Sequence, residues 1–182
     1  MRIYSLVFCI PLLSLLIFCK PRIDKAREFS STTQETGQSY FLKLAEICGD
    51  GYLVNHRDSS VIWNGKGWNI DSNMYVSLGA EARSVEEARR NSRQEISHYL
   101  ECMFVVGLEQ KPERIKVTLT FADIEDIFNP LVLGIYELKR ETLNDLENWD
   151  QEPSFLDRHR VSQFIESHME TRYEDWSEIV LE

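Results

Sequence analysis

Residues 74–99 read MYVSLGAEARSVEEARRNSRQEISHY and join a strand pattern directly to a helix pattern. Between residues 74 and 78 every second residue is a Met, Val or Leu, which is the period of a half-buried strand. Ser84 can accept hydrogen bonds from the first-turn amides of a helix, and Glu87 can reach back to the residues before it. From Val85 to Val106, apolar and small residues recur at alternating steps of three and four, which places them on one helix face. The stretch therefore predicts a strand followed by a helix that packs on a sheet.

A second pattern predicts a β-hairpin. Asn64-Gly65-Lys66-Gly67 lies between Val61-Ile62-Trp63 and Trp68-Asn69-Ile70, and Asn and Gly accept the positive φ angles that a tight turn demands. The hairpin would place Trp63 opposite Trp68. Such a pair either packs across the two strands or offers a platform on which a sugar ring stacks, and the sequence leaves both interpretations open.

The remaining periodicity completes the predicted fold. Further helices are expected over residues 39–48, 141–149 and 154–172, and strands over residues 115–121 and 131–136. Residues 102–108 are rich in β-branched and aromatic side chains, so the long helix could give way to a strand there. Together these elements predict an α+β fold of two layers, with a helix packed across a small antiparallel sheet and additional helices at the C-terminus.

The first eighteen residues have the pattern of an export signal. An initial Met-Arg precedes an apolar run from Ile3 to Phe18, and the run ends at Cys19. A spanning helix needs about 20 apolar residues, so this shorter run favours a cleaved signal over an uncleaved anchor or a buried helix. The end of the run, Leu16-Ile17-Phe18-Cys19, is similar to the lipobox of bacterial lipoproteins, which implies that Cys19 carries a lipid.

These observations divide the chain into three parts. Residues 1–18 are predicted to be a lipoprotein-type signal peptide, and residues 19–38, which are polar, a flexible tether. Residues 39–182 would form a single α+β domain, which is long enough to bury one core.

Charge is distributed unevenly along the chain, whose net charge is −10. Residues 19–120 carry 14 basic and 14 acidic side chains, whereas residues 121–182 carry 5 basic and 16 acidic ones, a net charge of −11. Such a surface repels nucleic acid, so nucleic acid is excluded as a partner. The acidic third is either a solvated face or a docking face for a basic partner or loosely held cations.

Four cysteines are present, and two of them belong to the N-terminal segment. With Cys9 in the signal and Cys19 lipidated, Cys48 and Cys102 remain. These two either form a disulfide in an oxidising compartment or pack as small buried hydrophobes. Neither has a nearby Cys or His in a zinc-binding pattern, and no metal or cofactor is expected.

The segments Tyr75–Ala82 (YVSLGAEA) and Ser84–Ser92 (SVEEARRNS) resemble the Lpp-twenty family of bacterial surface lipoproteins. Domains of that family begin with a strand that ends in small residues, continue with a Ser-x-Glu-Glu-Ala-Arg-x-Asn-Ala helix, and return as a strand. The family-like core would span residues 75–136, with residues 137–182 added as an acidic helical part. The resemblance implies a helix laid across an antiparallel sheet, attachment to the cell envelope, and no catalytic residues.

The sequence thus predicts a non-catalytic bacterial envelope lipoprotein, lipid-anchored in the outer membrane in preference to the inner one, with a structural or partner-binding role at the cell surface. Its expected partners are the membrane, through lipid on Cys19, and an envelope protein or peptidoglycan. The alternative is a secreted or periplasmic module that binds glycan or peptidoglycan through Trp63 and Trp68, or an enzyme of unrecognised type.

Overall fold

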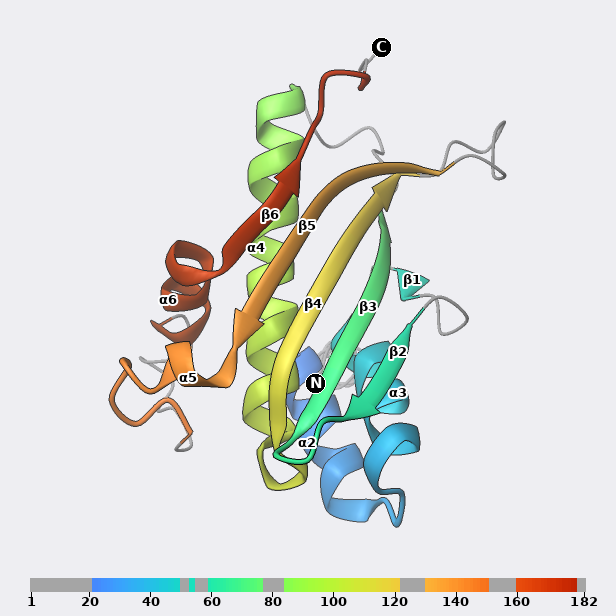
Figure 1. Cartoon of the computed structure of the whole chain (residues 1–182), viewed down its shortest axis with the longest axis vertical. Coiled ribbons are helices and arrows are strands. Elements are labelled where there is room, and N and C mark those ends of the chain that lie inside the picture. The colour runs from blue at the N-terminus through green and yellow to red at the C-terminus, as the bar shows by residue number, and fades with distance from the viewer. Residues whose placement is uncertain are drawn as a thin grey trace, which may run out of the picture.

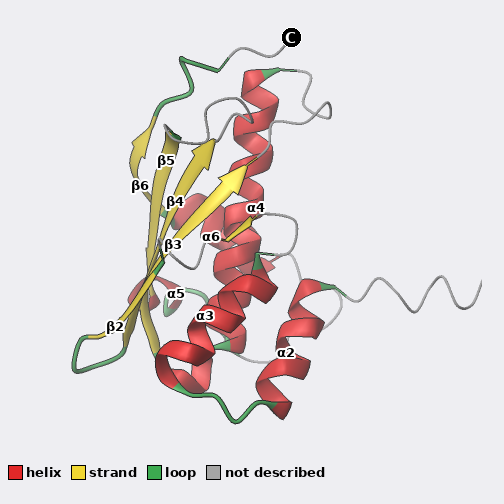
Figure 2. Cartoon of the chain, turned by 90° about the vertical axis from the view of Figure 1, so that its right-hand side faces the viewer, coloured by secondary structure: helices red, strands yellow, loops and turns green. Residues whose placement is uncertain are grey.

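The computed structural model describes residues 21–49, 53–54, 59–76, 84–121, 130–150 and 160–179. They form one sheet and a layer of helices that covers one of its faces (Figures 1 and 2). The strands are β1 (Leu53–Val54), β2 (Ser60–Trp63), β3 (Trp68–Val76), β4 (Pro112–Phe121), β5 (Leu131–Lys139) and β6 (Glu170–Glu174). The helices are α2 (Arg22–Thr32), α3 (Gly37–Cys48), α4 (Val85–Val106), the 3-10 helix η2 (Leu108–Gln110), α5 (Arg140–Leu143) and α6 (Arg160–His168). The predicted α+β class, with additional helices after the core, is confirmed.

The sheet is mixed, so the prediction of an antiparallel sheet, which the family resemblance also implied, is wrong. Its order is β1-β3-β4-β5-β6, with β2 also paired to β3, and β3 and β4 run parallel. The reason is the length of α4, which has 22 residues and so spans about 33 Å. The helix carries the chain back to the end at which β3 began, so β4 starts there and runs in the same direction.

Helix α4 begins where its sequence predicts. The backbone N–H of Glu87 donates to Oγ of Ser84, with 3.1 Å between the two atoms, which satisfies one of the first-turn amides. The helix then continues without a break to Val106. The alternative of a strand over residues 102–108 is therefore wrong.

The apolar face of α4 lies against the sheet. Ile96, Tyr99 and Met103 are completely buried there, and Oη of Tyr99 lies 2.6 Å from Oγ of Ser72 on β3. Helices α2, α3 and α6 also pack against α4, and α3 contacts β1, β2 and β3 beside it. Helix α4 is therefore the centre of the helix layer, with the sheet on one side and the shorter helices around it (Figures 1 and 2).

The predicted tether over residues 19–38 is wrong for its middle part, which forms α2. Ala26 of this helix is fully buried, and the ring of Phe29 stacks on Tyr40 of α3, with centroids 5.5 Å apart. At the start of the helix, Arg22 forms a 2.5 Å ion pair with Glu95 of α4. The polar sequence folds because these three contacts attach it to the helices that follow.

The C-terminal part differs from its prediction in two places. The helix expected to reach residue 172 ends at His168, and Glu170–Glu174 forms β6 on the free edge of β5. The ring of His168 stacks on Phe164 at a centroid distance of 4.0 Å. The helix expected over residues 141–149 shortens to the single turn of α5, and the predicted start of the longer helix, in residues 154–157, lies outside the described residues.

The β-patterns at the centre of the chain are confirmed. The hairpin forms with Val61 opposite Ile70, and β4 and β5 contain the two strands predicted from alternation. The second hairpin strand and the strand expected from residue 74 are one continuous element, β3.

Candidate functional site

A charged cluster lies where α4 crosses β5 and β6, and residues from three distant parts of the chain form it. Oε2 of Glu174 accepts a hydrogen bond from Arg89, and its Oε1 accepts one from Oη of Tyr136 at 2.5 Å. Arg93 approaches the same Oε1 at 3.5 Å and lies over the ring of Tyr136, 5.6 Å from its centroid. Only 9% of the Glu174 side chain is exposed.

The electrostatics of this cluster favour an ionised Glu174. Burial is the largest effect and would raise the pKa of that carboxyl group, but the hydrogen bonds from Arg89 and Tyr136 lower the pKa overall. Burial and the hydrogen bond to Glu174 raise the pKa of Tyr136 far above its ordinary value. A tyrosine with a raised pKa remains a donor at neutral pH, so Tyr136 keeps its hydrogen bond to Glu174 and the cluster joins α4 to the sheet.

A groove of about 670 Å³ opens beside this cluster. It is lined by the first turns of α4 and by Glu166 of α6, and its side chains are Ser84, Glu86, Glu87, Arg89, Arg90, Arg93 and Glu166. Among the described residues of the lining, only Ser84 has a hydroxyl group, and its Oγ already accepts from the backbone of α4. With three arginines against three glutamates, the groove suits a polar partner that carries both signs of charge.

The face of the sheet that the helices leave open carries a row of ion pairs. Asp71 of β3 binds Arg114 at 2.7 Å and Lys116 at 2.6 Å, both on β4. Glu137 of β5 binds Arg114 at 3.1 Å and Arg172 of β6 at 3.2 Å. Burial would raise the pKa of Glu137, but the hydrogen bonds from the two arginines lower it overall. Arg172 also binds Glu170 at 2.9 Å, so three basic and three acidic side chains balance one another across four strands, as expected of a surface in contact with water.

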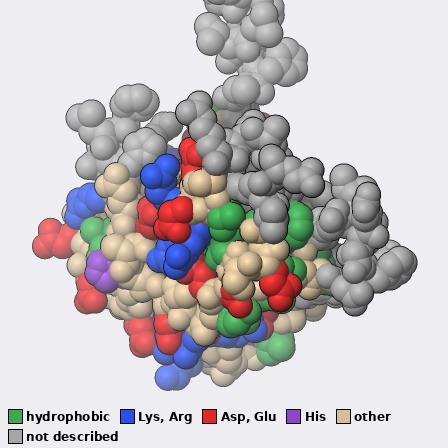
Figure 3. Space-filling model, turned by 90° about the horizontal axis from the view of Figure 1, so that it is seen from above, with side chains coloured by type: hydrophobic (Ala, Val, Ile, Leu, Met, Phe, Trp, Pro, Cys, Tyr) green, Lys and Arg blue, Asp and Glu red, His purple; other side chains and the backbone are tan. Residues whose placement is uncertain are grey.

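Acidic and basic side chains also alternate elsewhere. On the surface seen from above, both kinds are interspersed, and hydrophobic side chains form only small separate groups (Figure 3). Within the described part of residues 121–182, most of the acidic surplus lies in the segments that follow α5 (Asp145, Glu147, Asp150) and β6 (Asp175, Glu178), whereas β5, α5 and α6 are each balanced in charge. The described residues contain no group of three or more His, Cys, Asp or Glu side chains that could hold a metal ion.

The two hairpin tryptophans pack against each other and do not form a flat platform. Their ring centroids are 5.4 Å apart with an interplanar angle of 64°. Trp68 also packs against Phe41 and against Gly37, where an added Cβ would lie 3.0 Å from the Trp68 ring. Trp63 is 47% exposed and Trp68 is partly buried, so Trp63 is the more accessible of the two rings.

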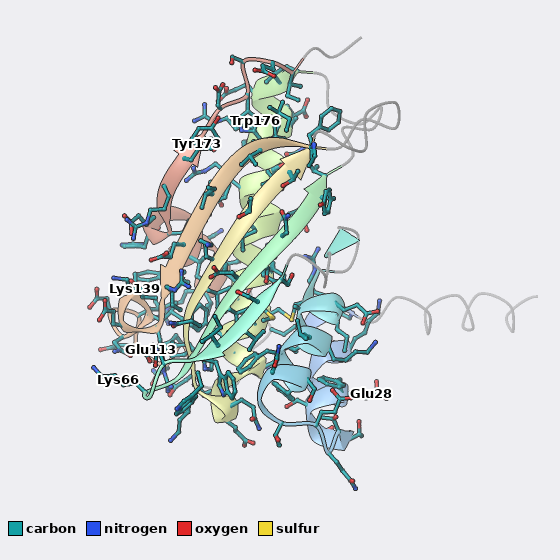
Figure 4. All side chains as sticks on the ribbon, turned by 45° about the vertical axis from the view of Figure 1, so that its right-hand side comes forward. Glu28, Lys66, Glu113, Lys139, Tyr173 and Trp176 are labelled. Atoms are coloured by element: carbon teal, nitrogen blue, oxygen red, sulfur yellow. A yellow bond between two sulfur atoms is a disulfide. The ribbon has the colours of Figure 1, made fainter. Side chains whose placement is uncertain are left out.

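Cys48 and Cys102 form a disulfide in the structure, with their Cα atoms 5.7 Å apart. Both residues are buried, and the bond joins the C-terminus of α3 to the last turns of α4 (Figure 4). Nη1 of Arg22 donates to the carbonyl oxygen of Cys48 at 3.4 Å, so α2 is held at the same point. Because the bond lies inside the helix layer, we assign it a role in stabilising the fold.

A buried carboxylate, Glu101, follows from the three-dimensional packing and has no counterpart among the residues singled out by sequence. It is 7% exposed and its pKa is raised to about 7, chiefly by burial and against the opposing effects of His98, Ser162 and Arg27. Ser162 belongs to α6 and Arg27 to α2. Glu101 therefore lies where three helices meet, beside the disulfide.

Of the residues predicted to be functional, the structure brings together Cys48 with Cys102 and Trp63 with Trp68. Cys19 lies outside the described residues. Arg89, Arg93 and Glu174 were missed, because their sequence separation of up to 85 positions leaves no local pattern.

No protein family model, curated protein or solved structure matches this chain. Within the described residues, none of the helices is both long enough and apolar enough to span a bilayer. Function must therefore be argued from the features of the chain itself.

Proposed function

We propose that this chain is the folded domain of a bacterial envelope lipoprotein, attached through Cys19, with a structural or partner-binding role and no catalytic one. The observation that carries the proposal is the buried disulfide between Cys48 and Cys102. Disulfides of this kind persist in oxidising compartments and are rare in the cytosol. The bond thus supports export, independently of the apolar N-terminal segment that ends at Cys19.

The charged groups described above support a binding or structural role. Glu174 and Glu137 are each neutralised by two arginines, and both have lowered pKa values. General acid–base catalysis favours groups whose pKa lies near the working pH. Glu101 has such a pKa, but it is buried between helices, where a substrate has no access.

Lipid attachment is tested by growing cells that express the full chain with radiolabelled palmitate. The expected result is a labelled protein whose label is lost in Cys19→Ser and kept in the matched control Cys9→Ser. A chain that takes up no label, or a Cys19→Ser variant that is labelled as strongly as the parent, would remove the lipid anchor from the proposal.

The compartment is tested separately by alkylating thiols in intact cells before lysis. Cys48 and Cys102 are expected to react only after reduction, since export leaves them bonded. If both react with the alkylating reagent without reduction, the protein resides in a reducing compartment and the envelope assignment fails.

A second candidate function is glycan or peptidoglycan binding through Trp63, favoured by the 47% exposure of that side chain. The test is retention of the protein on insoluble peptidoglycan. Trp63→Ala should lower retention at least fivefold, while Tyr173→Ala, at a similarly exposed aromatic residue on the far edge of the sheet, should not. Equal retention of Trp63→Ala and the parent would exclude this function.

A further inference from the structure

The two edges of the sheet are protected to different degrees. The edge strand β6 carries Glu170, Arg172 and Glu174, and charges on an edge strand discourage pairing with another chain. The strand β2 reads Ser-Val-Ile-Trp and has neither a charge nor a proline. It also carries Ile62, which is 62% exposed, and Trp63. Among the described strands, β2 pairs only with β3, so its other edge has no strand partner in the described part of the chain.

The backbone of β2 offers a defined set of hydrogen-bonding groups at this edge. The N–H of Asn64 donates to the carbonyl of Gly67 at 3.0 Å and closes the turn. Since hydrogen-bonded and non-hydrogen-bonded pairs alternate along antiparallel strands, Trp63 and Trp68 form a non-hydrogen-bonded pair. The N–H of Trp68 points the other way, to the carbonyl of Lys111 at 2.9 Å, as this alternation requires. Val61 and Trp63 therefore direct their N–H and C=O groups away from β3.

We propose that this edge pairs with β2 of a second copy of the chain, antiparallel, with Ile62 on the two-fold axis. In that register Val61 of each copy lies opposite Trp63 of the other, and each such pair exchanges two backbone hydrogen bonds. The two Ile62 side chains meet on the open face of the sheet. The same four residues serve both copies, as a symmetric contact requires.

The distribution of charge favours a second copy as the occupant. Residues 19–120, which contain β2, have equal numbers of basic and acidic side chains, whereas residues 121–182 have a net charge of −11. Within the described residues the acidic surplus lies in the segments that follow α5 (Asp145, Glu147, Asp150) and β6 (Asp175, Glu178), on the opposite side of the sheet from β2 (Figure 1). Pairing through β2 keeps these segments of the two copies apart, while pairing through β6 would bring them together. A four-residue edge buries little surface, so the dimer should depend on protein concentration.

The test introduces a cysteine on the proposed axis, Ile62→Cys, in the full chain expressed in bacterial membranes. Residues in such a non-hydrogen-bonded pair have Cα atoms about 4.5 Å apart, within the range of a disulfide. After mild oxidation, a reductant-sensitive dimer is expected on a non-reducing gel. The unsubstituted chain, which has the same native cysteines, and Tyr173→Cys, at the opposite edge (Figure 4), should yield at least fivefold less dimer.

A second variant, Ile62→Lys, places two like charges on the axis. Because Ile62 is largely exposed, thermal unfolding should be unchanged, while sedimentation of the detergent-solubilised full chain should show at least a tenfold weaker dimer. An Ile62→Cys chain that remains monomeric, crosslinks no better than Tyr173→Cys, or crosslinks to a different protein would overturn the proposal. Equal dimerisation of Ile62→Lys and the parent would also overturn it.

Discussion

Tyr136 on β5 donates a hydrogen bond to Glu174 on β6, with 2.5 Å between the two oxygens. Arg89 of α4 binds the other carboxylate oxygen, so one side chain joins the last strand both to its neighbour and to the central helix. This contact therefore connects the C-terminal part both to the sheet and to the central helix.

Replacing Glu174 with glutamine should lower the free energy of unfolding by about 2 kcal/mol at pH 7, since hydrogen bonds to a charged group are lost. The pKa of Glu174 is lowered in the folded state. Its contribution is therefore present above the unfolded pKa and is lost as pH falls through the folded one. Urea unfolding should show the difference between parent and variant shrinking below about pH 4. Glu178→Gln, at an exposed residue, should leave stability unchanged at every pH, and a Glu174→Gln effect that persists unchanged in acid would contradict this account.

The contribution of Glu101 to stability should depend on pH in the opposite sense to that of Glu174, because the pKa of Glu101 is raised to about 7. A raised pKa gives stability that is complete below the unfolded value, near 4.5, and is lost as pH rises through the folded one. Glu101→Gln should therefore be more stable than the parent by about 2 kcal/mol at pH 8, and the difference should close by pH 5.

The matched control for Glu101 is Glu95 on the same helix, whose pKa is lowered by its hydrogen bond to His98 and by Arg22, against burial. Glu95→Gln should destabilise the protein at pH 8. Thermal melts of both variants across pH 5–8 test the pair, and shifts of the same sign at pH 8 would contradict the assigned causes.

Reduction of the Cys48–Cys102 bond should lower the free energy of unfolding by about 4 kcal/mol, because the bond closes a loop across 54 positions. The measurement is guanidinium unfolding with and without reductant. The double variant Cys48→Ala/Cys102→Ala should be insensitive to reductant, and a parent protein equally insensitive to it would show that the bond contributes nothing.

The buried pair of Tyr99 and Ser72 provides a test of α4 packing. Tyr99→Phe leaves the Ser72 hydroxyl without the partner it has at 2.6 Å and should cost about 1–2 kcal/mol. Adding Ser72→Ala removes the unpaired group, so the double variant should cost less than the sum of the two single changes. Strictly additive costs would show that the two hydroxyls do not interact.

Local patterns in the sequence were enough to predict α4, its Ser84 cap, the hairpin and β4. Each of these depends on periodicity or turn residues within about twenty positions. Helix α2 was missed because its few apolar residues, such as Ala26, are buried only by contacts with α3 and α4. Strand β6 was missed because Glu170–Glu174 is polar and becomes a strand only by pairing with β5.

The direction of β4 and the cluster around Glu174 also depend on contacts between residues that are far apart in the sequence. Parallel pairing follows from the path of α4, which periodicity does not give. Arg89 and Glu174 are 85 positions apart, and only the sheet order brings them together. The prediction of a disulfide between Cys48 and Cys102 needed no such contacts. It followed from the number of cysteines that remain once Cys9 and Cys19 are assigned to the N-terminal segment.

Helix α2 also sets how far the domain can lie from a membrane. Only Lys20 separates Cys19 from Pro21, where the described structure begins, and two residues span at most about 7 Å. With lipid on Cys19, the connection would be too short to act as a flexible tether that lets the domain extend away from the membrane. The helix layer, which contains α2, would then face the bilayer. The ion-paired face of the sheet would point away from the membrane, where other molecules could contact it.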